Sequence, residues 1–111
     1  MRKTLILKKN EERAISALKE TLSRRFNIID LRLFGSRVRG EDTPESDVDV
    51  MIEIDKSSPE IESQIDDIVF EVNLENDTLI SAIIISKDEI EEGLMAESPI
   101  YKNIQKEGIS I

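Results

Sequence analysis

The sequence predicts a small two-layer α+β domain, in which helices pack on one face of a mixed β-sheet. Three observations support this prediction. The 111 residues are enough for one hydrophobic core and too few for two, so we expect residues 1–111 to form a single domain. Strand-like and helix-like hydrophobic patterns interleave along the chain. Residues 48–54 alternate between apolar and mostly acidic side chains, so one sheet face should meet helices and the other ligand or water.

The first part of the chain predicts a helix followed by a strand. Asn10 precedes two glutamates, as a capping residue precedes the acidic first turn of a helix. Apolar residues at three- and four-residue spacing extend this helix to about residue 25. Residues 28–34 alternate as a strand. Its apolar face is expected to consist of Ile29, Leu31 and Leu33.

A short turn separates the first two strands. Gly35 ends the first strand, residues 36–39 fit one helical turn, and Gly40 suits a left-handed exit from that turn. The polar loop 41–46 leads to the second strand, over residues 48–54. The apolar face of the second strand is expected to consist of Val48, Val50, Ile52 and Ile54.

The middle of the chain predicts a long helix and a third strand. Ser58-Pro59 is typical of a helix start, and Asn76-Asp77 of a helix end. Residues 79–86 carry no charge, which predicts a central or well-covered strand.

The last part of the chain predicts two short helices and an edge strand. A polar helix starts at Lys87 and is stopped by Gly93. Ser98-Pro99 begins a final helix that Gly108 ends, which leaves residues 109–111 as a short edge strand.

Composition limits the chemistry that this chain can perform. It has no cysteine and no histidine, so catalysis must rest on carboxylates, hydroxyls and bound metal. The net charge of -9 repels nucleic acid and anionic membranes, and suits a basic partner better. No apolar stretch has the length of a signal peptide core or a membrane span. We therefore expect a cytoplasmic protein without nucleic-acid or membrane partners.

The turn after the first strand is suited to a phosphate group. Gly35 allows close approach of the backbone, and the following helical turn presents free N–H groups. Ser36 adds a hydroxyl, and the guanidinium groups of Arg37 and Arg39 match phosphate oxygens. The alternative is an ordinary turn, which this short pattern alone does not exclude.

Two aspartates at the start of the second strand are suited to a metal ion. Asp47 and Asp49 project from the same face, with about 7 Å between their Cα atoms. Such a pair repels unless a cation lies between them, and Mg²⁺ prefers hard oxygen ligands together with substrate phosphates. The alternative is a pair of solvated acids on an exposed strand.

Together these residues resemble the minimal nucleotidyltransferase family of the polymerase-beta superfamily. The resemblance rests on Phe34-Gly35-Ser36-Arg37-Val38-Arg39-Gly40 followed by Ser46-Asp47-Val48-Asp49. It implies a nucleotidyltransferase fold, a Gly-Ser turn that holds a nucleoside triphosphate, and two aspartates that hold divalent metal. The expected ligands are Mg²⁺ and ATP or another triphosphate.

The same resemblance implies a third carboxylate that this sequence lacks. Its expected position is near Ser81 or Ala82, where no acidic residue lies. Asp77 is the nearest substitute in the sequence, although it is also suited to ending the preceding helix. Glu53 shares the strand face of Asp49 but lies about 13 Å further along it. Metal and nucleotide binding are therefore expected, while catalysis is left open.

Two functions of different classes follow from the resemblance. The first is an enzyme that transfers a nucleoside monophosphate from a Mg²⁺-bound triphosphate to a hydroxyl of a protein or another acceptor. The second is a catalytically weakened antitoxin or binding protein that neutralises a HEPN-type helical partner by complex formation. Homo-oligomer formation is compatible with both.

Overall fold

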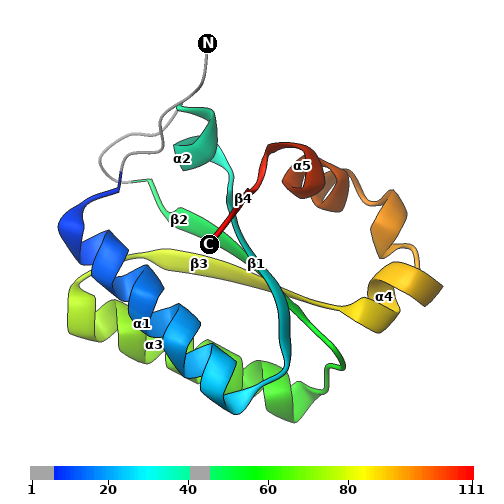
Figure 1. Ribbon diagram of the computed structural model, residues 1–111, viewed down its shortest axis with the longest axis horizontal. Coiled ribbons are helices and arrows are strands. Elements are labelled where there is room, and N and C mark those ends of the chain that lie inside the picture. Colours follow the sequence, from blue (N-terminus) through cyan, green and yellow to red (C-terminus); the bar gives the residue numbers. More distant parts are fainter. Residues whose placement is uncertain (1–6, 41–45) are drawn as a thin grey trace.

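The computed structural model describes residues 7–40 and 46–111, and the expected loop at 41–46 lies almost entirely outside them. The elements follow the predicted order (Figure 1). In chain order they are α1 Lys9–Arg25, β1 Ile28–Phe34, α2 Ser36–Arg39, β2 Val48–Ile54, α3 Pro59–Asn76, β3 Ile80–Ser86, α4 Lys87–Glu92, the 3-10 helix η1 Met95–Glu97, α5 Pro99–Glu107 and β4 Ile109–Ser110.

The four strands form one mixed sheet in the order β3-β2-β1-β4. The pairs β1–β2 and β1–β4 are antiparallel, whereas β2 and β3 are parallel. This arrangement confirms the predicted α+β class with a mixed sheet. No helix within the described ranges is long and apolar enough to cross a membrane.

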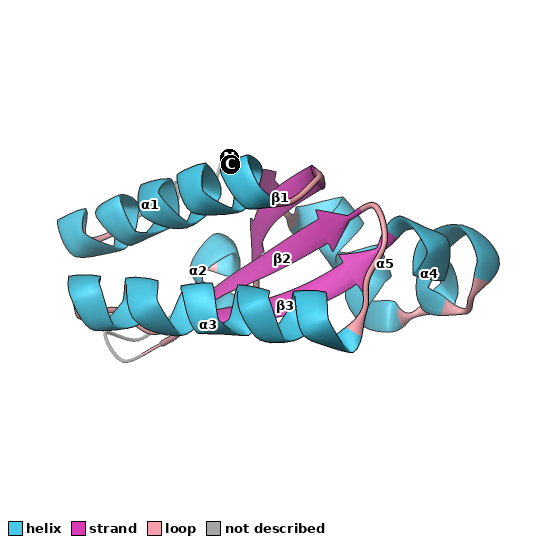
Figure 2. Cartoon of the chain, turned by 90° about the horizontal axis from the view of Figure 1, so that it is seen from below, coloured by secondary structure: helices cyan, strands magenta, loops and turns pink. Residues whose placement is uncertain are grey.

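The two long helices, α1 and α3, lie side by side over one face of the sheet (Figure 2). The core between them and the sheet contains the apolar face predicted for β2, from Val48 to Ile54, and the stripe predicted for α1. The short helices differ from the expected one-sided arrangement. Ile104 of α5 packs with Met51 and Ile85 in a second, smaller cluster on the opposite face.

Asn10 does not have the capping role that the sequence predicts. The helix begins two residues earlier, with Lys8 at the cap position, so Asn10 lies inside the first turn. Its side-chain Nδ2 instead donates to the carbonyl oxygens of Asn76 (3.1 Å) and Asp77 (3.0 Å). These carbonyls end α3, so Asn10 joins the start of the first long helix to the end of the second.

The prediction for Ile29 is also wrong. The register between β1 and β2 shifts between Ile28 and Asp30, which inserts one extra residue into β1. Ile28 then packs against the main core, and Ile29 is 45% exposed. A bulge of this kind inverts the alternation of all residues before it.

β3 lies at an edge of the sheet, so of the two alternatives that its lack of charge predicts, a central or a well-covered strand, the central one is wrong. Both of its faces are covered, because Ile80 and Ile84 contact the main core and Ile85 the second cluster. The outer edge is blocked at its first residue: the Asn73 amide accepts from Ile80 N (2.8 Å) and donates to Ile80 O (3.1 Å). Burial of both faces explains the absence of charge without a neighbouring strand.

Candidate active site

The turn between β1 and α2 is built around Gly35. This residue has φ 83° and ψ -158°, a conformation available essentially only to glycine. Its carbonyl oxygen accepts from the N–H groups of Val38 and Arg39, each at 3.1 Å, which closes the predicted helical turn. Gly40 ends the turn with φ 74°, confirming the predicted left-handed exit.

Asp49 of β2 lies directly against this turn. It pairs in register with Phe34 of β1, the residue before Gly35. A Cβ atom on Gly35 would overlap Asp49 Oδ2 and would lie 3.1 Å from its Cγ. Glycine is therefore required at position 35 for two reasons, the backbone conformation and the close approach of a carboxylate.

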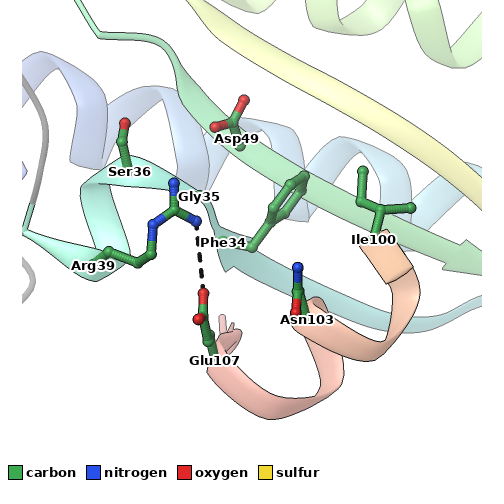
Figure 3. A pocket seen from close by; sticks show the side chains of 8 residues that line it. All are labelled: Phe34, Gly35, Ser36, Arg39, Asp49, Ile100, Asn103 and Glu107. Atoms are coloured by element: carbon green, nitrogen blue, oxygen red, sulfur yellow. Dashed lines mark ion pairs between the residues drawn. The ribbon is translucent and has the colours of Figure 1, made fainter. Parts of the chain in front are cut away.

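Gly35 and Asp49 line a cavity of about 360 Å³, within the size range of ligand sites. Figure 3 shows that its walls come from three parts of the chain. The β1–α2 turn and β2 form one side, and one face of α5 forms the other. The lining residues are Phe34, Gly35, Ser36, Arg39, Asp49, Ile100, Asn103 and Glu107.

The carboxyl group of Asp49 has a pKa above its ordinary value. Burial is the main cause, and the negative charge of Asp47 adds to it, while the positive charge of Arg39 acts in the opposite direction. Asp47 is exposed and immediately precedes β2. The two aspartates are thus close enough to repel, as the sequence predicts.

The chemistry of this pair, two like-charged side chains with oxygen donors, is compatible with a divalent cation. Bringing a cation to Asp47 and Asp49 would offset the repulsion between them. In the part of the chain that the structure describes, no group of three or more acidic residues is placed to hold a metal ion. The remaining coordination positions would fall to substrate oxygens and water, which is the usual arrangement for Mg²⁺.

Arg37 does not reach the cavity, contrary to the sequence-based expectation. Its side chain is 5% exposed, and the guanidinium group donates to both carboxylate oxygens of Glu11, at 2.8 and 2.7 Å. It also donates to the carbonyl oxygen of Ser46 at 3.0 Å. Arg37 therefore ties the turn to α1 and to the chain just before Asp47.

Arg39 lines the cavity and is paired across it. Arg39 Nη1 lies 3.6 Å from Glu107 Oε2 of α5, with both side chains partly exposed (Figure 3). Since Arg39 also acts electrostatically on Asp49, it stands between two carboxylates of the cavity. A bound triphosphate would bring further negative charge to this guanidinium group.

The expected place of the third carboxylate is occupied by Ser81. The parallel register pairs Asp49 with Ser81, so their side chains project from the same face of the sheet. Asp77 does not substitute, because it caps α3 in a left-handed conformation and does not line the cavity. Glu53 pairs with Ile85, four positions further along β3.

Sequence reasoning missed the wall that α5 contributes. Ile100, Asn103 and Glu107 follow at positions i, i+3 and i+7, which places them on one side of the helix. This spacing is present in the sequence. The sequence does not show that this side of α5 faces a turn more than sixty residues earlier in the chain.

Comparison with known proteins gives three findings. Residues 15–111 match the sequence profile of the nucleotidyltransferase domain. Over 40 residues the chain is 42% identical to a Methanocaldococcus jannaschii protein named as a candidate protein adenylyltransferase. That alignment spans 36% of this chain and 40% of the relative, so the chain covers less than half of it.

The third finding is a crystal structure of a candidate nucleotidyltransferase from Sulfolobus solfataricus. It matches with a TM-score of 0.50 and 19% identity, over 95% of this chain and 87% of that one. At this identity the likeness concerns the fold alone, that is, the arrangement of mixed sheet and helices described above for this chain.

Proposed function

Because the chain belongs to the nucleotidyltransferase domain family, we propose that it transfers a nucleoside monophosphate from Mg²⁺-bound ATP, or another nucleoside triphosphate, to a hydroxyl group of a protein or other acceptor. The observation that carries the proposal is the contact between Asp49 and the Gly35 turn. It places a partly buried carboxylate beside a backbone suited to phosphate, in a cavity that also contains Arg39.

Each side chain has a proposed role in this reaction. The Gly35-Ser36 turn binds the phosphates through N–H groups and the hydroxyl, and Arg39 neutralises their charge. Asp47 and Asp49 hold the divalent ion, which when bound polarises the phosphoryl group. The acceptor oxygen forms a bond to the α-phosphorus, the bond from that phosphorus to the bridging oxygen breaks, and pyrophosphate leaves.

Removal of the proton from the acceptor hydroxyl has no side-chain base beside Asp49. A carboxylate next to Asp49 would accept it, but Ser81 occupies that position. In this chain the proton passes to water. We therefore expect slow transfer unless the acceptor or a partner supplies a base.

The presence of Ser81 in place of a carboxylate beside Asp49 favours a second function. A chain that binds metal and nucleotide but transfers slowly could act by forming a complex, as an antitoxin of a HEPN-type helical protein. This proposal rests on the family resemblance together with Ser81. A supporting result would be neutralisation of such a partner by an Asp47→Ala/Asp49→Ala variant.

Calorimetry of ATP with and without Mg²⁺ tests the site. We expect Mg²⁺-dependent binding by the natural chain, and its loss in the Asp47→Ala/Asp49→Ala variant. Glu53→Ala is the matched control, because it removes an acid from the same strand face outside the cavity. Absence of Mg²⁺-dependent binding in the natural chain would overturn the nucleotide site.

Incubation with ATP labelled at the α-phosphorus then separates the two functions. Label that appears on an acceptor protein supports the transferase. If no acceptor and no divalent metal ever gives transfer, the enzyme proposal fails and the binding protein remains.

A further inference from the structure

The α5 wall of the cavity is rigidly held. Ile104, one turn after Ile100 and next to the lining face of the helix, is 1% exposed and packs with Met51 and Ile85. The helix ends at Gly108, whose N–H donates to the Ile104 carbonyl at 2.7 Å, and β4 then joins the sheet beside β1. A wall fixed in this way can contribute to specificity, because its side chains need little ordering when a ligand binds.

This wall has a different chemistry from the opposite side of the cavity. Ile100 is 44% exposed, although it belongs to a helix that packs on the sheet. It lies in the lining together with the half-buried Phe34. Between them and Glu107, the Asn103 amide projects from α5 into the cavity (Figure 3). Together with Phe34 of β1, the wall therefore offers two apolar surfaces and one side chain that can both donate and accept.

The features suited to phosphate and metal all lie on the other side. Gly35, Ser36 and Asp49 belong to the β1–α2 turn and β2, and Arg39 bridges from that side to α5. If the triphosphate group of a nucleotide binds there, the nucleoside part of the nucleotide lies on the α5 side. Apolar surfaces suit the faces of a planar base, and an amide suits its polar edge.

From this arrangement we propose that the α5 wall, together with Phe34 of β1, is the nucleoside subsite, with Phe34 and Ile100 against the base and Asn103 hydrogen-bonded to its edge. The proposal rests on the proposed function and names its substrate. The Asn103 amide has one acceptor and one donor group, which match the amino group and ring nitrogen of adenine. The corresponding edge of guanine presents two acceptors. An amide that contacts the N6 and N7 edge of the base therefore favours adenine over guanine.

Titration with three ligands tests this subsite: Mg-ATP, Mg-GTP and Mg-tripolyphosphate, which has the phosphates without a nucleoside. We expect the natural chain to bind Mg-ATP at least tenfold more tightly than the other two. Asn103→Ala should weaken Mg-ATP about tenfold, the usual effect of losing one or two hydrogen bonds, and leave Mg-tripolyphosphate unchanged. Gln105→Ala is the matched control, because it removes an exposed amide of α5 outside the cavity.

The outcomes separate this inference from the proposed function. Equal affinity for Mg-ATP and Mg-tripolyphosphate in the natural chain, or an unchanged Mg-ATP affinity in Asn103→Ala, would overturn the nucleoside subsite alone. Binding of neither ligand by the natural chain would overturn the proposed function together with the subsite. Ile100→Ser gives a second variant, which should weaken Mg-ATP without affecting Mg-tripolyphosphate.

Discussion

Replacing Gly35 with alanine should damage the stability of the chain and its binding of metal and nucleotide, for two separable reasons. The conformation at Gly35, φ 83° and ψ -158°, is unfavourable for any residue with a side chain by about 1–3 kcal/mol. In addition, the new Cβ would overlap Asp49 Oδ2. Relief of that overlap requires the carboxylate to move by more than about 0.5 Å, beyond the tolerance of a pre-organised site.

Gly40 provides the matched control. It too has a positive φ, 74°, but a Cβ there would meet no atom of the residues that the structure describes within 4 Å. Gly40→Ala should therefore lose only the backbone contribution, about 1–2 kcal/mol, and keep its affinity for Mg-ATP within about twofold. Gly35→Ala should lose at least as much stability and weaken Mg-ATP binding about tenfold or more. Urea denaturation and calorimetry measure the two effects.

A double-mutant cycle isolates the contribution of the overlap. Asp49→Ala removes the carboxylate that a Cβ on Gly35 would meet. Gly35→Ala should therefore destabilise the Asp49→Ala background less than the natural chain, leaving the backbone term alone. If Gly35→Ala binds Mg-ATP like the natural chain, or if Gly40→Ala loses binding to the same extent, the close approach at Gly35 does not organise the site.

Two further predictions concern residues outside the phosphate-binding turn. Glu11→Gln should lower the free energy of unfolding at pH 7 by about 3–5 kcal/mol, because it leaves the buried Arg37 charge without its partner. Burial raises the pKa of Glu11. The hydrogen bonds from Arg37 and the Lys8 N–H, together with the positive charges of Arg37 and Lys8, lower it by more, so the pKa is below its ordinary value of 4.5. The stability that this carboxylate contributes is thus present above pH 4.5 and is lost as the pH falls through the lower pKa of the folded state. The difference in free energy of unfolding between the natural chain and Glu11→Gln, measured by urea denaturation, should therefore shrink on acidification. Ser81→Asp should increase transfer of α-labelled nucleotide at least tenfold, because it places a carboxylate beside Asp49; an increase in Mg-ATP affinity without faster transfer would contradict a role for that position in proton removal.

The sequence predicts the elements around the site closely because their signals are local. The bounds of β1, α2 and β2 are as predicted, since alternation and the two flanking glycines determine them within a few residues. The prediction fails where the outcome depends on distant partners. The bulge at Ile29 and the edge position of β3 follow from strand pairing, which alternation does not encode.

The candidate site shows the same division between local and distant signals. The residues proposed to bind phosphate and metal lie within fifteen residues of one another, so a local motif is enough to propose them. The direction of the Arg37 side chain could not be predicted, because it depends on Glu11, 26 residues earlier. The α5 wall lies still further away in sequence, and only its helical spacing could have indicated it.

This division also bears on how catalysis and binding can separate in such a domain. Gly35, Ser36 and Asp49 are held by short-range structure and by the Arg37 contacts with Glu11 and the backbone before β2. The position of Ser81 depends instead on the pairing of β3, an edge strand whose register is set by its own apolar residues. A substitution at that position changes proton removal without disturbing the turn or the aspartate pair. A domain of this kind can therefore have slow transfer and retain nucleotide binding through a single residue, which is the state that we propose for this chain with Ser81.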